Sequence, residues 1–455
     1  MAETAVPELV AALAAGVVAS ATRRSRQAAA SSAKALAQTA CAGPESARGV
    51  AEAPGALPAL VAALAAGGAA AAAAPGLQSA ATDSAAALAH LTSAGAGLAL
   101  CVAKAPGALQ TLITALALGG ATATPSKQDA AKMCAAALGH IALAGPDLAR
   151  CVAQVPGALS TLAAAMAGRR HCGTVAAPSL QCKAANIALV LSCVAEADQK
   201  LARRVAEMPG ALATLAGFVA TGGAAAVDSA RSLASIAEAG PELSRRLAEV
   251  PGALATLFTA VAAGGPAAAQ SLQDTAETSA GALASIAEAG PELARRVAEV
   301  PGALATLFTA VAPGGPAAAQ SLQETAEPSA GALASIAKAD PELARRVAKV
   351  PGALATLVAA VAAGGAAAAP SLQGTAVMSA LALASIAKAD PELARRVAEV
   401  PGALATLVAA MAAGGTVAAP SLQCKAANIA LVLGCVAQAD QKLARRVAEM
   451  PGALA

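Results

Sequence analysis

Histidine and cysteine side chains are the candidate metal ligands of this 455-residue chain. His90 and His140 stand 50 residues apart, and His171 and Cys172 precede Cys182 in an irregular basic segment. Ligands of one zinc ion each lie about 2 Å from it, whereas packed helices lie about 8–10 Å apart. His90 and His140 on neighbouring helices would therefore not share an ion. The cluster at Cys182 has no second ligand pair at zinc spacing, so we expect no metal site and no cofactor.

Catalytic patterns are also missing from the sequence. It contains no recognisable nucleophile–base pair, no paired carboxylates and no phosphate-binding loop. An active site needs one unique constellation of such groups. We therefore predict a protein that is not an enzyme and has no small-molecule substrate.

Paired arginines recur along the second half of the chain and could bind an acidic partner if they align. A glutamate follows most pairs at helical spacing, which favours a salt-bridged surface over a ligand site. After Arg345 and Arg346 that glutamate is replaced by Lys349, so this pair is the best electrostatic candidate for partner binding. The pairs are Arg203-Arg204, Arg245-Arg246, Arg295-Arg296, Arg345-Arg346, Arg395-Arg396 and Arg445-Arg446.

Nine cysteines without a CxxC pair indicate reduced thiols in a cytosolic protein. Cys182 and Cys193 are eleven residues apart, as are Cys424 and Cys435, so each pair shares a helix face if its helix is unbroken. The two contexts are near copies, because residues 174–212 match residues 416–454 with two changes. Copied blocks suit a stacked array better than an active site.

The elements that must position these residues repeat along the whole chain. A PGALATL-like segment returns every 42 to 53 residues, and Pro7 opens the same pattern. A fixed period of this size is typical of a solenoid, which buries its core by stacking neighbouring units. We predict one array over residues 1–455, with repeats at 7–53, 54–105, 106–155, 156–208, 209–250, 251–300, 301–350, 351–400 and 401–450, and a truncated repeat at 451–455.

One period reads as three helices. Pro291–Val300 has proline at a first helical position and an acidic first turn, which predicts a short helix. Ala303–Ala312 carries Leu304, Leu307, Phe308 and Val311 at helical spacing, which predicts a second helix ended by glycines. Ser329–Lys338 predicts a third helix that begins near Pro328, since proline is tolerated in a first turn.

Two further features refine this unit. Asp340 and Asp390 precede the short-helix proline and are expected N-caps, while Glu292–Arg296 and Arg295–Glu299 are expected four-residue ion pairs. The repeat at 209–250 has 42 residues and lacks the eight-residue segment that Pro316–Gln323 exemplifies. That Ala-rich segment therefore reads as an insertion before the third helix.

A three-helix repeat of about 42 residues, with a DPELARR-like short helix, a PGAL opening and an ALASIA-like third helix, resembles the armadillo family. The resemblance covers essentially the whole chain, and the short helix before each PGAL favours it over the two-helix HEAT repeat. It implies an all-α, right-handed α-solenoid of about nine three-helix repeats. In that family the third helices line a concave groove that binds proteins or extended peptides.

The resemblance also implies a ladder of groove positions that bind the peptide backbone. None of these positions is the family's asparagine, and none of the positions four residues earlier is tryptophan, which speaks against an importin-alpha-like peptide carrier. Serine at these positions can instead bond a carbonyl one turn back in its own helix. The ladder residues are Gln38, His90, His140, Cys193, Ser235, Ser285, Ser335, Ser385 and Cys435.

Composition limits the partners. The core must consist of Ala, Leu, Val and Ile, because the chain has no Trp or Tyr and three Phe. A net charge of +3 from 31 basic and 28 acidic residues lacks the footprint that phosphate-backbone binding requires. Nucleic acid is therefore not the expected partner, although an RNA-binding solenoid stays the alternative from another class. A homogenised Ala-rich product with little selected function is a third reading.

The hydropathy of the chain and the charges near its N-terminus indicate its cellular location. Glycine pairs such as Gly67-Gly68 interrupt the apolar stretches, so we expect no apolar helix of the roughly 20 residues that cross a bilayer. Glu3 and Glu8 precede the first apolar run and arginines follow it, the reverse of a secretory signal. The expected location is the cytoplasm, with the nucleus left open.

Overall fold

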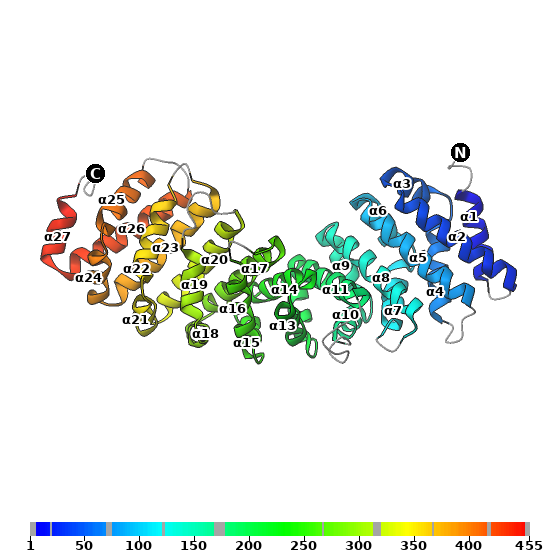
Figure 1. Ribbon diagram of the computed structural model, residues 1–455, viewed down its shortest axis with the longest axis horizontal. Coiled ribbons are helices and arrows are strands. Elements are labelled where there is room, and N and C mark those ends of the chain that lie inside the picture. The colour runs from blue at the N-terminus through cyan, green and yellow to red at the C-terminus, as the bar shows by residue number, and fades with distance from the viewer. Residues whose placement is uncertain are drawn as a thin grey trace. The chain divides into compact units, whose positions relative to one another are not determined.

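The computed structural model describes residues 6–18, 21–69, 75–120, 123–167, 178–265, 268–312, 320–365, 368–415 and 420–450 (Figure 1). These residues form 27 α-helices and no strand. The chain divides into two compact units, Met1–Leu215 and Ala216–Ala455. The all-α architecture expected from the sequence is confirmed.

Three kinds of helix follow one another in a fixed order. The second helices are α1 (Val6–Val17), α4 (Ala56–Ala69), α7 (Ala108–Leu118), α10 (Ala158–Ala167), α13 (Ala211–Thr221), α16 (Ala253–Ala263), α19 (Ala303–Val311), α22 (Ala353–Ala363) and α25 (Ala403–Gly415). The third helices are α2 (Arg23–Cys41), α5 (Pro75–Ser93), α8 (Pro125–Leu143), α11 (Pro178–Ala197), α14 (Ala224–Glu238), α17 (Gln270–Glu288), α20 (Gln320–Ala339), α23 (Pro370–Ala389) and α26 (Pro420–Ala439). The short helices are α3 (Pro44–Glu52), α6 (Ala96–Lys104), α9 (Pro146–Gln154), α12 (Gln199–Glu207), α15 (Pro241–Glu249), α18 (Pro291–Glu299), α21 (Pro341–Lys349), α24 (Pro391–Glu399) and α27 (Gln441–Ala448).

The Pro-Gly step turns the chain between each short helix and the next second helix. In six such pairs the two axes meet at 87° to 92°. The glycine of the step adopts a left-handed conformation, with φ of +77° at Gly302 and +76° at Gly352. Other residues rarely adopt this conformation, so the recurring glycine is required by the backbone of the turn.

Within each unit, successive third helices pack side by side. In the second unit α14 contacts α17, and the series continues through α20, α23 and α26 (Figure 1). The core consists of aliphatic side chains, as expected, and equivalent leucines such as Leu283, Leu333 and Leu383 are fully buried. Each repeat therefore completes its core against its neighbours.

Glycine at the end of a second helix has a packing role as well as a stopping role. A Cβ atom at Gly364 would overlap the Cβ of Ala376 on α23, and the same holds for Gly264 and Ala276. The second helix thus ends in close contact with the third helix of its own repeat. Gly314 and Gly315, the pair expected to end α19, lie outside the described residues.

The third helix is longer than the sequence pattern indicated. α20 begins at Gln320, so Pro328 lies inside it, and the prediction of a start near Pro328 is wrong. The 42-residue repeat contains the 15-residue α14, whereas the other described third helices have 19 or 20 residues. Much of the expected insertion is therefore an extra turn at the N-terminus of the third helix, where Pro370 and Pro420 occupy first-turn positions.

Two of these long helices correct the expectation about apolar segments. α23 and α26 each have 20 residues and a mean hydropathy of 1.3, which is long and apolar enough to cross a membrane by length and composition. Gly67 and Gly68 do not interrupt α4, which continues to Ala69. In α23, half of the apolar window is buried against other helices.

Candidate functional site

The expected ladder residues all lie in third helices. Gln38 on α2 is exposed, whereas the other eight are half-buried. Because successive third helices pack side by side within a unit, equivalent positions come to lie on neighbouring helices. We call the surface that carries these residues within each unit its third-helix face.

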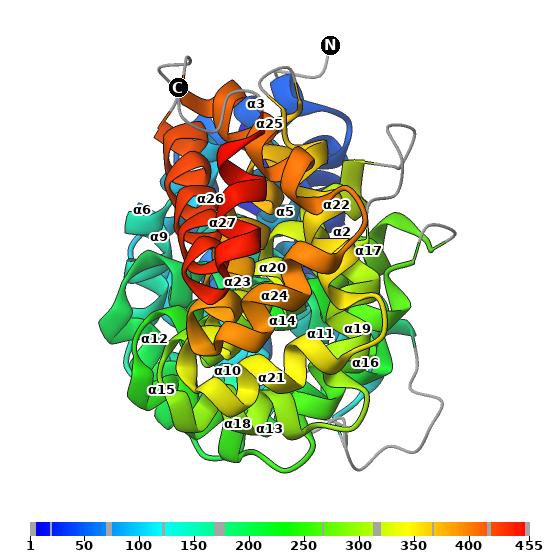
Figure 2. The same ribbon diagram turned by 90° about the vertical axis from the view of Figure 1, so that its left-hand side faces the viewer.

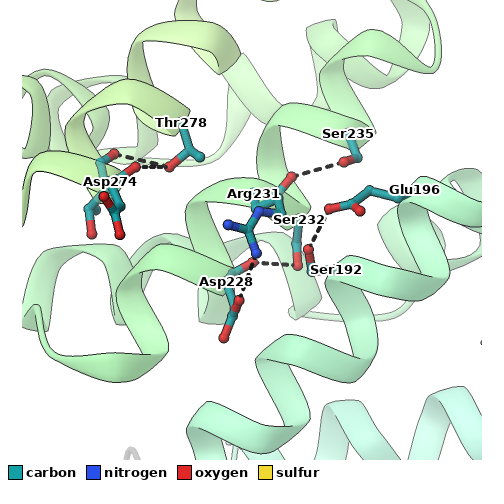
Figure 3. Close-up of polar contacts among 9 residues, drawn as sticks. Ser192, Glu196, Asp228, Arg231, Ser232, Ser235, Asp274 and Thr278 are labelled. Carbon is teal, nitrogen blue, oxygen red and sulfur yellow. Dashed lines mark hydrogen bonds and ion pairs between the residues drawn. The ribbon is translucent and has the colours of Figure 1, made fainter. Parts of the chain in front are cut away.

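The serine hydroxyls of this face bond within their own helices where a partner exists. Ser235 Oγ donates to the Arg231 carbonyl at 3.0 Å (Figure 3). Ser285 Oγ likewise donates to the Gly281 carbonyl at 3.0 Å. The alternative of a bond one turn back is therefore confirmed at these two positions. Ser335 and Ser385 make no such bond in the described part of the chain. Each hydroxyl keeps lone pairs that a partner could use.

His90 and His140 are neighbours, as their equivalent positions require. Thr92 Oγ lies 3.4 Å from Nδ1 of His140. Burial lowers the pKa of His140, a backbone bond at Ala89 opposes this, and the nearby His90 adds to the lowering. No group of three or more His, Cys, Asp or Glu side chains that could bind a metal occurs among the described residues. His171 and Cys172 lie outside them.

The paired arginines connect neighbouring repeats. The second arginine of a pair donates to the last turn of the preceding short helix: Arg296 to the Ala248 carbonyl at 2.8 Å, Arg396 to that of Ala348 at 2.9 Å. A guanidinium at a helix C-terminus also neutralises the negative end of the helix dipole. The first arginine reaches forward instead, as Arg295 does to Asp340.

These contacts revise two predictions. Arg295 and Arg296 bind partners in the adjacent repeats, not the Glu299 and Glu292 of their own helix. Arg345 donates to Asp390 through two nitrogens, at 3.0 and 2.9 Å, and Arg346 donates to the Ala298 carbonyl at 3.0 Å. Arg345 therefore has a carboxylate partner in the next repeat, whereas Arg346 is bound by a neutral carbonyl, and partner binding by this pair stays a prediction.

The expected N-caps are confirmed. They explain why Arg295 and Arg345 bind an aspartate of the next repeat and not a glutamate of their own helix. Asp340 Oδ1 accepts from the Glu342 amide at 2.8 Å, and Asp390 Oδ1 accepts from the Glu392 amide at 3.0 Å. The second carboxylate oxygen of each is then available to the arginine of the preceding repeat. The backbone bond, and after it the arginine, lower the pKa of both carboxyl groups.

Acidic side chains on the third-helix face were not singled out by the sequence pattern. Glu277 and Glu327 stand eight residues before Ser285 and Ser335, on the same side of α17 and α20. Burial raises the pKa of both, and for Glu277 the nearby Glu324 raises it further. Their fifty-residue spacing was the signal that could have revealed them.

Other charged side chains lie close to Glu277 and Glu327, both along α17 and on the neighbouring third helices. Asp274 lies one turn before Glu277, and α14 contributes the Asp228–Arg231 ion pair at 3.2 Å (Figure 3). The Glu327 carboxylate occupies the space that a Cβ at Gly374 on α23 would need. This part of the third-helix face is therefore acidic, whereas the sequence had directed attention to the arginines.

Two buried lysines were also missed. Lys183 on α11 donates to the Gly119 carbonyl at 3.0 Å, and Lys425 on α26 donates to the Gly364 carbonyl at 2.7 Å. Their exposed fractions are 5% and 1%. Equivalent third-helix positions carry Thr275 and Thr375, so the lysines belong to the duplicated block. Each amine binds the C-terminal end of a second helix in the preceding repeat.

Burial lowers the pKa of both amines, which predicts a pH-dependent stability. Between the lowered pKa and the ordinary value of about 10.4, the unfolded chain binds more protons than the folded chain. The free energy of unfolding should therefore rise with pH in that window. We expect the double variant Lys183→Met/Lys425→Met to lose this rise in denaturant melts across alkaline pH. The exposed Lys388→Met is the matched control, and an unchanged slope in the double variant would refute the assignment.

A solved structure shares this architecture over nearly the whole chain. An engineered protein is 18% identical to the chain, with a TM-score of 0.61 over 96% of this chain and 99% of its own. The fold is an armadillo-like helical repeat. A designed armadillo repeat protein is also 18% identical, with a TM-score of 0.42 over 73% of this chain and 99% of its own. Another, solved in complex with a (KR)4 peptide, is 21% identical, with a TM-score of 0.47 over 61% and 99%. No family model matches the sequence, and no curated protein matches it.

Proposed function

We propose that this protein is a non-catalytic scaffold in the cytoplasm that binds protein segments along the third-helix face. The observation that carries the proposal is the row of half-buried side chains on adjacent third helices. A partner that lies across these helices can contact several repeats at once, as the armadillo-like fold allows. Protein or extended peptide is therefore the partner class.

The charge of the third-helix face indicates which kind of protein segment it prefers. Glu277 and Glu327 are partly buried carboxylates near other acids, and their raised pKa shows that the folded chain disfavours their ionised form. A cationic segment across α17 and α20 would stabilise the ionised form by opposite charge. We propose that this part of the face prefers Lys- or Arg-bearing segments.

The experiment compares matched arginine substitutions. The intact chain, the Ser285→Arg/Ser335→Arg variant and the Thr259→Arg/Thr309→Arg variant are used as baits in quantitative pull-downs. Thr259 and Thr309 are exposed on second helices and bond one turn back, at 2.9 Å, as Ser285 does. They therefore control for an added charge at a hydroxyl position on another face.

We expect partners to be lost from the serine variant, by tenfold or more, and retained by the threonine variant. Adding bulk and positive charge to the third-helix face should block a cationic segment through overlap and like-charge repulsion. Equal loss of partners from both variants, or loss from the threonine variant alone, would show that partners bind outside the third-helix face. Partners released from the chain by nuclease would contradict the preference for protein.

A further inference from the structure

The third-helix face of the second unit changes its chemistry from one repeat to the next. α17 and α20 carry the same residue types at three positions of this face, spaced four residues apart, and all six residues are half-buried. They are Glu277, Gly281 and Ser285 on α17, and Glu327, Gly331 and Ser335 on α20. Residues four apart lie on one side of a helix. Each helix therefore presents a carboxylate, a stretch of backbone without a side chain and a hydroxyl in one line.

The two glycines leave open space beside the carboxylates. A Cβ atom at Gly281 would meet no atom of another helix within 4 Å, and at Gly331 it would meet the Cβ of Ala284 at 3.9 Å. These glycines are therefore not required for close packing, in contrast to Gly264 and Gly364. The aliphatic part of a lysine or arginine side chain can lie on this backbone while its charged end reaches the glutamate.

Glu277 and Glu327 have no ion-pair partner among the described residues. The positive charge of Arg231 on α14 lowers the pKa of Glu277, but burial and three nearby carboxylates raise it, and Arg231 is already paired with Asp228 at 3.2 Å. Burial alone raises the pKa of Glu327. A cation from a partner would supply the missing opposite charge at both glutamates.

α23 continues the face with apolar side chains. α20 contacts both α17 and α23, so the three helices form one continuous surface (Figure 2). On α23, Val377 takes the place of the glutamate and Leu381 that of the glycine, with Met378 beside them, and all three are half-buried. This helix therefore offers an apolar contact where α17 and α20 offer a carboxylate and open space.

α14 limits the surface on the other side of α17. Arg231 occupies the position equivalent to Gly281 and is half-buried. Its guanidinium fills the place that is open on α17 and repels a further cation. Two neighbouring third helices can thus accept a cationic side chain, and the helices on either side of them cannot.

We infer that α17, α20 and α23 bind an extended protein segment that places two cationic side chains on α17 and α20 and an apolar side chain on α23. The inference rests on the proposed function and adds the order of side chains in the partner. Packed helices lie about 8–10 Å apart, and an extended chain advances about 3.3 Å per residue. The three side chains therefore come from residues about three positions apart.

Three synthetic peptides of identical composition test this order. Each is labelled with a fluorophore and contains two lysines and one leucine, separated by glycine–serine pairs. The orders are lysine-lysine-leucine, leucine-lysine-lysine and lysine-leucine-lysine. Because the segment can run in either direction, we expect one of the first two to bind the full chain at least tenfold more tightly than the third in fluorescence anisotropy. Equal affinity of all three peptides, tightest binding of the third, or no detectable binding would overturn the inference.

Two variants move the boundary between acidic and apolar contacts. Val377→Glu/Leu381→Gly gives α23 the residues of α20, and we expect it to bind a three-lysine peptide at least tenfold more tightly than the unmodified chain does. Glu327→Val/Gly331→Leu gives α20 the residues of α23 and should weaken the preferred two-lysine peptide by a similar factor. Both variants introduce residues that a neighbouring third helix already accommodates, and circular dichroism checks their folding.

Thr309→Glu is the matched control, because it adds a carboxylate at an exposed position of a second helix. An equal gain in three-lysine binding by this control would show that net charge, and not the order of contacts, decides the affinity. The peptide comparison on the unmodified chain does not depend on any variant folding. Failure of the peptide order while Ser285→Arg/Ser335→Arg still loses its partners would overturn this inference alone. Retention of partners by that serine variant would count against the proposed function itself.

Discussion

Replacing Leu307 by alanine is expected to destabilise α19 and its neighbours by about 2–5 kcal/mol, the usual range for a buried leucine. Leu307 is fully buried, as are its equivalents Leu257, Leu357 and Leu407. The truncated side chain would leave a cavity, because contacts on both sides hold the surrounding helices in place. The change should appear as local opening, since stability in a stacked array is nearly additive along the chain.

Hydrogen exchange is the suitable measurement. At 1.4 kcal/mol per factor of ten, the loss corresponds to amide exchange in α19 that is roughly thirty-fold faster or more. Leu304→Ala is the matched control, because Leu304 is partly exposed and should show a smaller effect. Residues 54–155 should keep their protection. Uniform deprotection along the whole chain would show that the array unfolds as one unit.

Local patterns predicted the second and short helices closely. The second helix was expected at 303–312 and forms Ala303–Val311, and the short helix was expected at 291–300 and forms Pro291–Glu299. Both are bounded by the Pro-Gly step, whose geometry depends on two adjacent residues. The caps at Asp340 and Asp390 depend on three consecutive residues and were equally readable.

Interactions between repeats were less predictable. A helix register suggested that Arg295 would bind Glu299, yet Asp340 binds it across 45 residues. The sequence shows both carboxylates, but it does not show that the capping geometry leaves one oxygen of Asp340 facing the previous repeat. Burial of Lys425 is a similar case, because its acceptor at Gly364 lies in the preceding repeat.

The helices that carry the ladder residues were predictable, whereas the acidic side chains near them were not. The ladder positions lie on the third helices as expected, and the hydroxyls of Ser235 and Ser285 bond their own backbone. The acidic residues nearby were visible as a fifty-residue recurrence of Glu277 and Glu327. Both glutamates lie in the N-terminal parts of α17 and α20. The sequence did not predict these parts as helix, because Pro328 suggested a later start.

Replacing Pro328 by threonine is expected to stabilise α20 by about 1–3 kcal/mol. An interior proline removes one helix hydrogen bond, here to the Glu324 carbonyl, and crowds the preceding turn, at a cost of about 3 kcal/mol. The more flexible unfolded chain of the variant offsets about 1 kcal/mol of this gain. α17 shows the outcome, because Thr278 occupies the equivalent position and its Oγ donates to the Asp274 carbonyl at 2.9 Å.

The reciprocal variant, Thr278→Pro, tests the same effect in the opposite direction, because α17 and α20 have similar sequences. Thr278→Pro should lower the protection of Asp274 and Glu277 amides against hydrogen exchange, while Pro328→Thr should raise that of Glu324 and Glu327. Both changes should be confined to the helix that carries the substitution. If Pro328→Thr leaves exchange unchanged while Thr278→Pro accelerates it, α20 has already adapted to its proline, and the bond to Glu324 contributes little there.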